Sequence, residues 1–188
     1  MVLVETRVLE WRQPFWWSGR SRDCYERSTF MPASDNWPDY RIWPARNSST
    51  PQCELAWCHG APGIALARID SLQYIDDFET REEIRIALRS TAQSKFGFNH
   101  CLCHGDLGNL DILCHAARRM QAVSNAAVDE LKGRVLTTLC NIGCLCGWSA
   151  LLPAPGLMVG LAGVGYGLLR LASWQRLPSV LILEPPAL

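Results

Sequence analysis

The chain has 188 residues, which is enough for one ordinary domain with its own core. Hydrophobic residues make up 48% of the sequence, which excludes an intrinsically disordered polypeptide. Lysine and arginine total 18, as do aspartate and glutamate, so the formal net charge is zero. Because nucleic-acid-binding proteins usually carry a basic excess, we expect no nucleic-acid partner.

The amino terminus does not look like a secretory signal peptide. Glu5 and Glu10 lie within its first ten residues, and no long apolar run is present. The nine cysteines are therefore expected in a reducing compartment, and we predict a cytoplasmic protein. In that setting cysteines more often bind metal, act in catalysis or fill the core than form disulfides.

The first part of the chain reads as irregular structure. Residues 1–24 combine arginines with aromatic residues and show little helical period, so we treat them as an atypical N-terminal segment. Residues 32–51 contain four prolines with serine and asparagine between them, a composition typical of loops.

Helices separated by glycine-rich turns are predicted from Trp57 onward. Pro62 suits the first turn of a helix that runs to about Tyr74. Thr80 and Glu83 have the spacing of a capping box, which predicts the start of a second helix. Its buried face has helical spacing and ends before Gly97; it comprises Ile84, Ala87, Leu88 and Thr91.

Three further helices and a strand are predicted in the second half. The helices run from about Leu110 to Val123, from Asn125 onward, and from about Leu161 to Ala172. The segment 179–183 (SVLIL) follows Pro178 and predicts a short C-terminal strand.

The stretch between Arg134 and Arg170 contains no Asp, Glu, Lys or Arg. One interpretation is a membrane hairpin formed by Leu136 to Leu169. Many glycines and two prolines interrupt this stretch, and tightly packed helices have the same composition. We therefore favour buried helices and expect no membrane insertion.

An internal repeat is the most informative feature. Residues 58–63 (CHGAPG) and 103–108 (CHGDLG) share the pattern C-H-G-x-x-G, and Gly160 to Gly163 repeats the G-x-x-G part. Each copy precedes an apolar helix, and a period of about 45 to 55 residues fits one helical hairpin per repeat. Glycines at the helix starts allow backbones to approach closely around a shared centre.

The duplicated Cys-His pair predicts a zinc site. Thiolate and imidazole are preferred zinc ligands, and two distant turns that supply three ligands are typical of a catalytic site with one open position. From the residues alone the candidates are Cys58 and Cys103 with one or both of His59 and His104. The alternative is that all four are ordinary core residues.

Other candidates receive structural interpretations. We assign Cys114, Cys140 and Cys144 to the core and His115 to a helix face, and treat His100 and Cys101 as neighbours of the second motif. Asp106 either caps its helix, which we favour, or orients a ligand.

The three motifs in order resemble the LanC-like lanthionine cyclases. The matching segments are AWCHGAPGIALARI (56–69), CLCHGDLGNLDIL (101–113) and PGLMVGLAGVGYGLLRLA (155–172). Residues 25–41 and 178–186 also resemble segments of that family, most closely the cyclase half of the class II (LanM-type) lanthipeptide synthetases. The resemblance covers residues 25–188, which we expect to be the C-terminal part of such a domain.

This resemblance implies an all-α fold, part of an α/α toroid of six hairpins, around a zinc ion. Its ligands would be Cys58, Cys103 and His104, and His59 would not be one. The reaction would be Michael addition of a peptide cysteine to dehydroalanine or dehydrobutyrine. The substrate would be a dehydrated precursor peptide, and the product a thioether ring.

One part of the family pattern is absent. The acid/base histidine of the family belongs to an earlier motif, and residues 1–23 contain no histidine. We therefore name no catalytic residue and expect a truncated form, without the dehydratase domain and the early helices of the toroid. The alternatives are a catalytically incomplete remnant that binds zinc and thiol peptides, or one half of a split synthetase whose other half acts in trans.

Overall fold

The computed structural model describes residues 25–42, 51–146, 154–173 and 176–185. It divides into two compact units, residues 1–30 and residues 31–188. In the first unit, residues 25–29 are helical, and Ser28 and Thr29 donate hydrogen bonds to carbonyls three residues earlier. The expected N-terminal segment, residues 1–24, lies outside the described residues.

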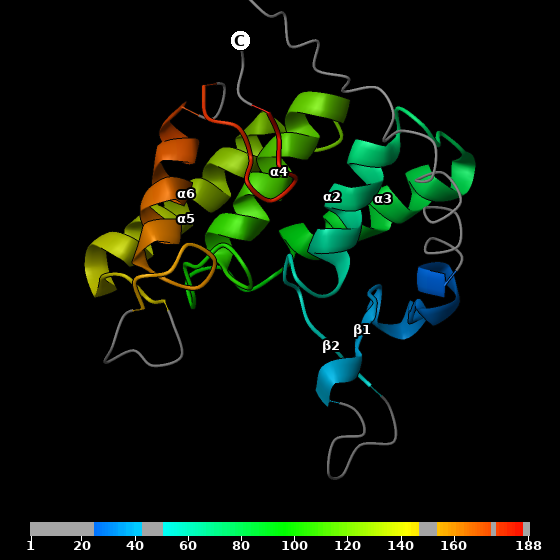
Figure 1. Cartoon of the computed structure of the whole chain (residues 1–188), viewed down its shortest axis with the longest axis horizontal. Coiled ribbons are helices and arrows are strands. Elements are labelled where there is room, and N and C mark those ends of the chain that lie inside the picture. Colours follow the sequence, from blue (N-terminus) through cyan, green and yellow to red (C-terminus); the bar gives the residue numbers. More distant parts are fainter. Residues whose placement is uncertain (1–24, 43–50, 147–153, 174–175, 186–188) are drawn as a thin grey trace, which may run out of the picture. The chain divides into compact units, whose positions relative to one another are not determined.

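Helices make up most of the regular structure of the second unit, as predicted (Figure 1). It begins with short elements: η1 (Pro32–Ser34), β1 (Pro38–Asp39), η2 (Tyr40–Ile42) and β2 (Gln52–Cys53), with β1 antiparallel to β2. The helices follow as α2 (Ala61–Ser71), α3 (Phe78–Ala92), α4 (Asp106–Met120), α5 (Asn125–Ile142) and α6 (Leu161–Ser173).

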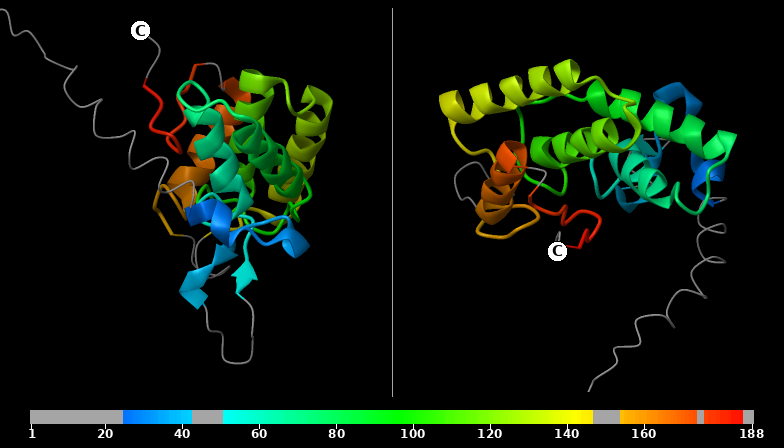
Figure 2. Two further views of the ribbon diagram at one scale, coloured as in Figure 1. Left: turned by 90° about the vertical axis from the view of Figure 1, so that its right-hand side faces the viewer. Right: turned by 90° about the horizontal axis from the view of Figure 1, so that it is seen from above.

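These helices form two layers. In the right-hand view of Figure 2, α3 and α5 lie in one layer, and α2, α4 and α6 lie in the other. The hairpins α2–α3 and α4–α5 each place one helix in each layer, and α6 is the inner helix of a third repeat. This arrangement is part of an α/α toroid, so the predicted fold class is confirmed.

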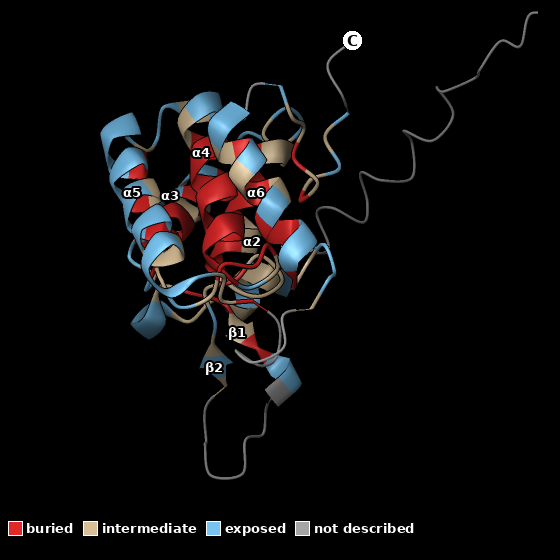
Figure 3. Ribbon diagram, turned by 90° about the vertical axis from the view of Figure 1, so that its left-hand side faces the viewer, coloured by how far each residue is buried: buried red, intermediate tan, exposed pale blue. Residues whose placement is uncertain are grey.

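Burial differs most between α4 and α5. In α4 every residue from Asp106 to Ala116 is buried, and this helix contacts α2, α3, α5 and α6 (Figure 3). Helix α5 buries only a stripe, Val128, Leu131 and Val135, and leaves its other faces in solvent. The enclosed helix α4 therefore has no solvent-facing stripe between Asp106 and Ala116, whereas the outer helix α5 needs only one apolar face.

The start of α3 differs from the sequence prediction. The helix begins at Phe78, with Asp77 as its N-cap accepting a hydrogen bond from the Thr80 backbone N–H (2.8 Å). Thr80 is buried inside the first turn. Glu83 pairs with the buried Arg68 of α2 (2.7 Å) and so joins the two helices of the hairpin. The predicted capping box at Thr80 and Glu83 was wrong, because Asp77 is an equally good cap one turn earlier.

The predicted C-terminal strand is not formed. Residues 180–183 turn, Leu183 has a left-handed backbone (φ 51°), and the Glu184 N–H donates to the Ser179 carbonyl (2.9 Å). The Ser179 hydroxyl donates to Asp111 of α4 (2.6 Å). Side-chain bonds to the helices thus fix this segment, and its apolar residues pack without a partner strand.

None of the helices in the described ranges has the combination of length and apolar character that crossing a bilayer requires.

Candidate metal centre

The three glycine-rich turns lie side by side and are joined by backbone hydrogen bonds. The Cys58 N–H donates to the Cys103 carbonyl (3.3 Å), and the Cys103 N–H donates to the Met158 carbonyl (2.8 Å). These three residues are equivalent, since each precedes the first glycine of its G-x-x-G by two positions. The repeat seen in the sequence is therefore a structural repeat around one centre, with Met158 in the third place.

The glycines of the repeat allow this close approach. A Cβ atom placed on Gly63, Gly108 or Gly163 would lie 2.2, 1.9 or 1.8 Å from the carbonyl oxygen six residues earlier. The first glycines of the motifs, Gly60, Gly105 and Gly160, meet the carbonyl six residues earlier in the same way. In each turn the backbone therefore packs against the glycines at the start of its helix, too closely for a residue with a side chain at those positions.

Cys58, Cys103 and His104 converge at this centre. One ligand atom from each lies within 4.8 Å of the others. Zinc bonded to sulfur at about 2.3 Å and to nitrogen at about 2.0 Å has tetrahedral edges of about 3.5–3.8 Å, so small adjustments bring the three atoms into range. Cys58 and Cys103 are half-buried and His104 is exposed, which leaves one side open to solvent.

The protonation states also suit a soft cation. Burial, followed by the hydrogen bond with Cys58, raises the pKa of Cys103 to about 12. Burial lowers the pKa of His104, so its imidazole is neutral at pH 7 and available as a ligand. A divalent cation removes the protons of coordinating thiols, so the donor set of two thiolates and one imidazole fits zinc.

Hydrogen bonds to Asp106 and Cys101 stabilise the loop that carries Cys103 and His104. Asp106 accepts a hydrogen bond from the Gly97 N–H (2.9 Å), and burial raises the pKa of its carboxyl to about 6. The His104 N–H donates to Cys101 Sγ (3.4 Å). Asp106 is the first residue of α4 and its carboxylate binds the preceding loop, so the predicted capping role was wrong.

The other predicted residues lie in varied surroundings. Cys114 is buried as expected, whereas Cys140 is exposed, and Cys144 is half-buried with its Sγ 3.5 Å from Cys146 Sγ. Cys140 is exposed because it lies on the solvent side of the outer helix α5. His115 belongs to α4 but is buried, since α4 is enclosed on all sides.

His59 lies beside the three-residue cluster but outside it. Its Nδ1 is 3.8 Å from Oδ1 of Asp39, a buried carboxylate of β1. His100 is buried, and its Nδ1 accepts a hydrogen bond from the Leu145 N–H (3.0 Å). The duplicated motif therefore does not place its two histidines alike.

The segment before β2 supplies residues that sequence reasoning missed. Asn36 accepts hydrogen bonds from the Ala61 and Trp37 N–H groups (2.7 and 2.8 Å) and so caps α2 from 25 positions earlier. Asp39 forms a forked ion pair with Arg41 (2.6 Å). In the sequence, Asn36, Asp39 and Arg41 belong to the run NWPDYR (36–41). This run resembles the LanC-like family but does not indicate which of its residues act at the site.

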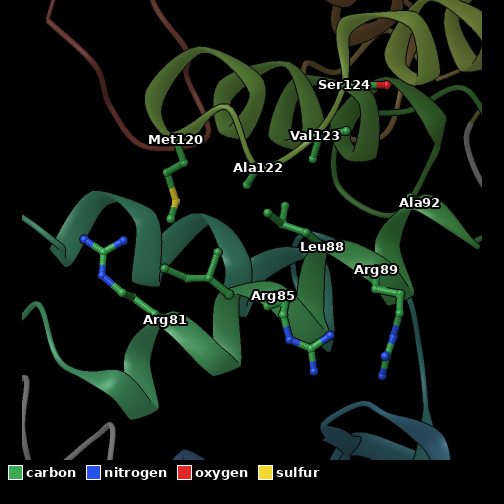
Figure 4. A pocket seen from close by; sticks show the side chains of 10 residues that line it. Arg81, Arg85, Leu88, Arg89, Ala92, Met120, Ala122, Val123 and Ser124 are labelled. Atoms are coloured by element: carbon green, nitrogen blue, oxygen red, sulfur yellow. The ribbon is translucent and has the colours of Figure 1, made fainter.

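A separate groove lies between α3 and the α4–α5 connection (Figure 4). Its volume is about 380 Å³, and Leu88 and Val123 are among the apolar residues that line it. Its three arginines are each paired with a carboxylate: Arg81 with Asp76, Arg85 with Glu82 and Arg89 with Asp35. It contains no residue of the Cys58–Cys103–His104 cluster.

Comparison with known proteins agrees with this geometry. Residues 23–182 match the family described as lanthionine synthetase C-like protein. The chain belongs to this family. It is also 33% identical over 131 residues to the lacticin 481/lactococcin biosynthesis protein LcnDR2 of Lactococcus lactis subsp. lactis. That alignment covers 61% of this chain and 14% of LcnDR2, so the chain spans a small part of the length of this relative.

Proposed function

We propose that the chain is part of a zinc-dependent lanthionine cyclase, which joins a peptide cysteine to dehydroalanine or dehydrobutyrine as a thioether. The observation that carries the proposal is the convergence of Cys58, Cys103 and His104 on one open-sided centre. Family membership and the similarity to a lacticin biosynthesis protein support it.

The residues of the centre suit this chemistry. Bound zinc would supply an open Lewis-acid position at which the substrate sulfur is held as a thiolate at neutral pH. Cys58, Cys103 and His104 would hold the ion from one side, and the exposed side would admit the peptide. The substrate would be a dehydrated precursor peptide, supplied by a dehydratase domain of the same or another chain. The described cysteines are free thiols, which suits a cytoplasmic location.

A second candidate is a chain that binds zinc and thiol peptides without completing the reaction. The four histidines favour it: His104 belongs to the cluster, His100 and His115 are buried, and His59 alone remains beside the site. The reaction also needs an acid that protonates the carbon of the dehydro residue after the thiolate has added to it. Of the four histidines, His59 alone is placed near enough to the site to be considered for this step. In a split synthetase, a partner chain would provide the acid.

Metal content tests the proposal first. We expect about one zinc per purified chain by mass spectrometry, falling below about a tenth in Cys58→Ala and Cys103→Ala, because each loses a thiolate from a three-ligand set. His104→Ala should weaken binding in the same direction. Cys140→Ala removes an exposed thiol of α5 and should leave the zinc content unchanged. Full zinc retention in Cys103→Ala contradicts the assignment.

The two candidates separate in a second assay. The zinc-loaded chain is mixed with a short peptide that contains one cysteine and one dehydrobutyrine, and the loss of thiol reactivity toward an alkylating reagent is followed. Ring formation above the rate without protein supports the cyclase. Thiol binding without ring formation supports the incomplete chain.

A further inference from the structure

The guanidinium of Arg41 is held by Asp39, the carboxylate that lies beside His59. Its Nε donates to Asp39 Oδ1 (3.0 Å), its Nη2 donates to Asp39 Oδ2 (2.6 Å), and its backbone N–H also donates to Oδ1 (3.0 Å). The Asp39 side chain is 1% exposed, whereas that of Arg41 is 61% exposed. A buried carboxylate therefore holds an arginine that remains accessible to a ligand.

The same carboxylate connects Arg41 to His59, which lies beside the cluster. Asp39 Oδ1 lies 3.8 Å from Nδ1 of His59, the residue that follows Cys58. The pairing of β1 with β2 fixes this arrangement, since Pro38 lies opposite Cys53 and Asp39 opposite Gln52.

The charge of the metal centre suggests a role for Arg41 in binding a thiolate ligand. Two thiolates neutralise a divalent cation, so a third thiolate from a substrate makes the centre net negative. A nearby guanidinium offsets that charge and leaves the binding of a neutral ligand almost unchanged. The side chain of Arg41 is exposed, so its guanidinium is accessible to a bound peptide.

We propose that Arg41, held by Asp39, is the anion-recognition residue of this centre and makes it select a peptide thiolate over a neutral ligand. The inference rests on the proposed function, because it requires a metal ion bound by Cys58, Cys103 and His104. It identifies Arg41 as a positioning residue that favours the nucleophile of the reaction. The accompanying Asp39 keeps the guanidinium in place when no peptide is present.

Ligand binding to the cobalt-loaded full chain tests the role without requiring catalysis. Cobalt(II) replaces zinc and gives an absorption band when sulfur binds. N-acetylcysteinamide, whose only charge is its thiolate, and neutral imidazole are titrated separately at pH 7.5 and low salt. Arg41→Gln should raise the Kd of the thiol about 5- to 10-fold and that of imidazole less than 2-fold, with cobalt content unchanged.

Two further variants sharpen the test. Arg41→Lys keeps the positive charge but loses the two-point hydrogen bonding to Asp39. Its Kd for the thiol should lie between those of the unaltered chain and Arg41→Gln. Arg81→Gln removes a similarly forked arginine of α3, paired with Asp76, and should change neither Kd. In about 1 M salt the effect of Arg41→Gln should shrink, because exposed charges are screened.

The outcomes separate the two proposals. Equal changes for thiol and imidazole, or no change for either, overturn the role of Arg41 while the metal site stands. Loss of cobalt from Arg41→Gln also overturns it, since Arg41 would then be structural. If the unaltered chain binds no metal, the proposed function fails and this inference fails with it.

Discussion

Replacement of Gly108 by alanine is expected to destabilise the fold by about 3 kcal/mol, the upper end of the usual cost of overpacking. The new Cβ would lie 1.9 Å from the Leu102 carbonyl oxygen and 2.9 Å from its carbonyl carbon. Both are backbone atoms, so no side-chain movement relieves the contact. Urea unfolding followed by far-UV circular dichroism measures the change.

The same substitution should weaken metal binding. Leu102 directly precedes Cys103 and His104, so a shift of its carbonyl displaces two residues of the cluster. The matched control is Gly133→Ala in α5, where no atom lies within 4 Å of the added Cβ. There alanine should stabilise the helix by up to about 1 kcal/mol without affecting zinc content. A similar free energy of unfolding for both variants would contradict this account.

Asp111→Ala is expected to cost about 3–5 kcal/mol, because it removes the carboxylate nearest to the buried Arg170 and leaves that charge poorly compensated, with Glu184 4.0 Å away. Asp111 of α4 accepts hydrogen bonds from Arg170 Nε (2.9 Å) and from the Ser179 hydroxyl (2.6 Å). Arg170 also donates to the Leu177 carbonyl. This network joins two inner helices to the C-terminal segment, so its loss should expose residues 176–185 to proteolysis.

A double-mutant cycle tests whether the loss of stability in Asp111→Ala comes from the buried charge of Arg170. Arg170→Met in the Asp111→Ala background should recover much of the lost stability, because no buried charge then remains. Asp129→Ala breaks an exposed pair with Lys132 and should change stability by less than about 1 kcal/mol. Additive effects of the two buried substitutions would show that they act independently.

The repeat and the residues that could meet at its centre were predictable from the sequence. The C-H-G-x-x-G spacing placed Cys58 and Cys103 on equivalent turns, and apolar periodicity located the five long helices, although α3 and α4 begin earlier than predicted. Such features are local, since a turn needs its glycines and a helix needs its apolar face whatever lies beyond it. The choice between His59 and His104 followed only from the family resemblance.

The polar residues that surround the centre could be identified only from the three-dimensional structure. Asn36 and Asp39 act on groups about 20 or more positions away, and no local pattern distinguishes them from ordinary loop residues. The segment after Pro178 has the composition of a strand, but a strand requires a partner, and the bonds from Ser179 to Asp111 and Glu184 fix it as a turn instead. Local propensity gives way there because the buried charges of Asp111 and Arg170 must be satisfied by whatever chain lies nearest.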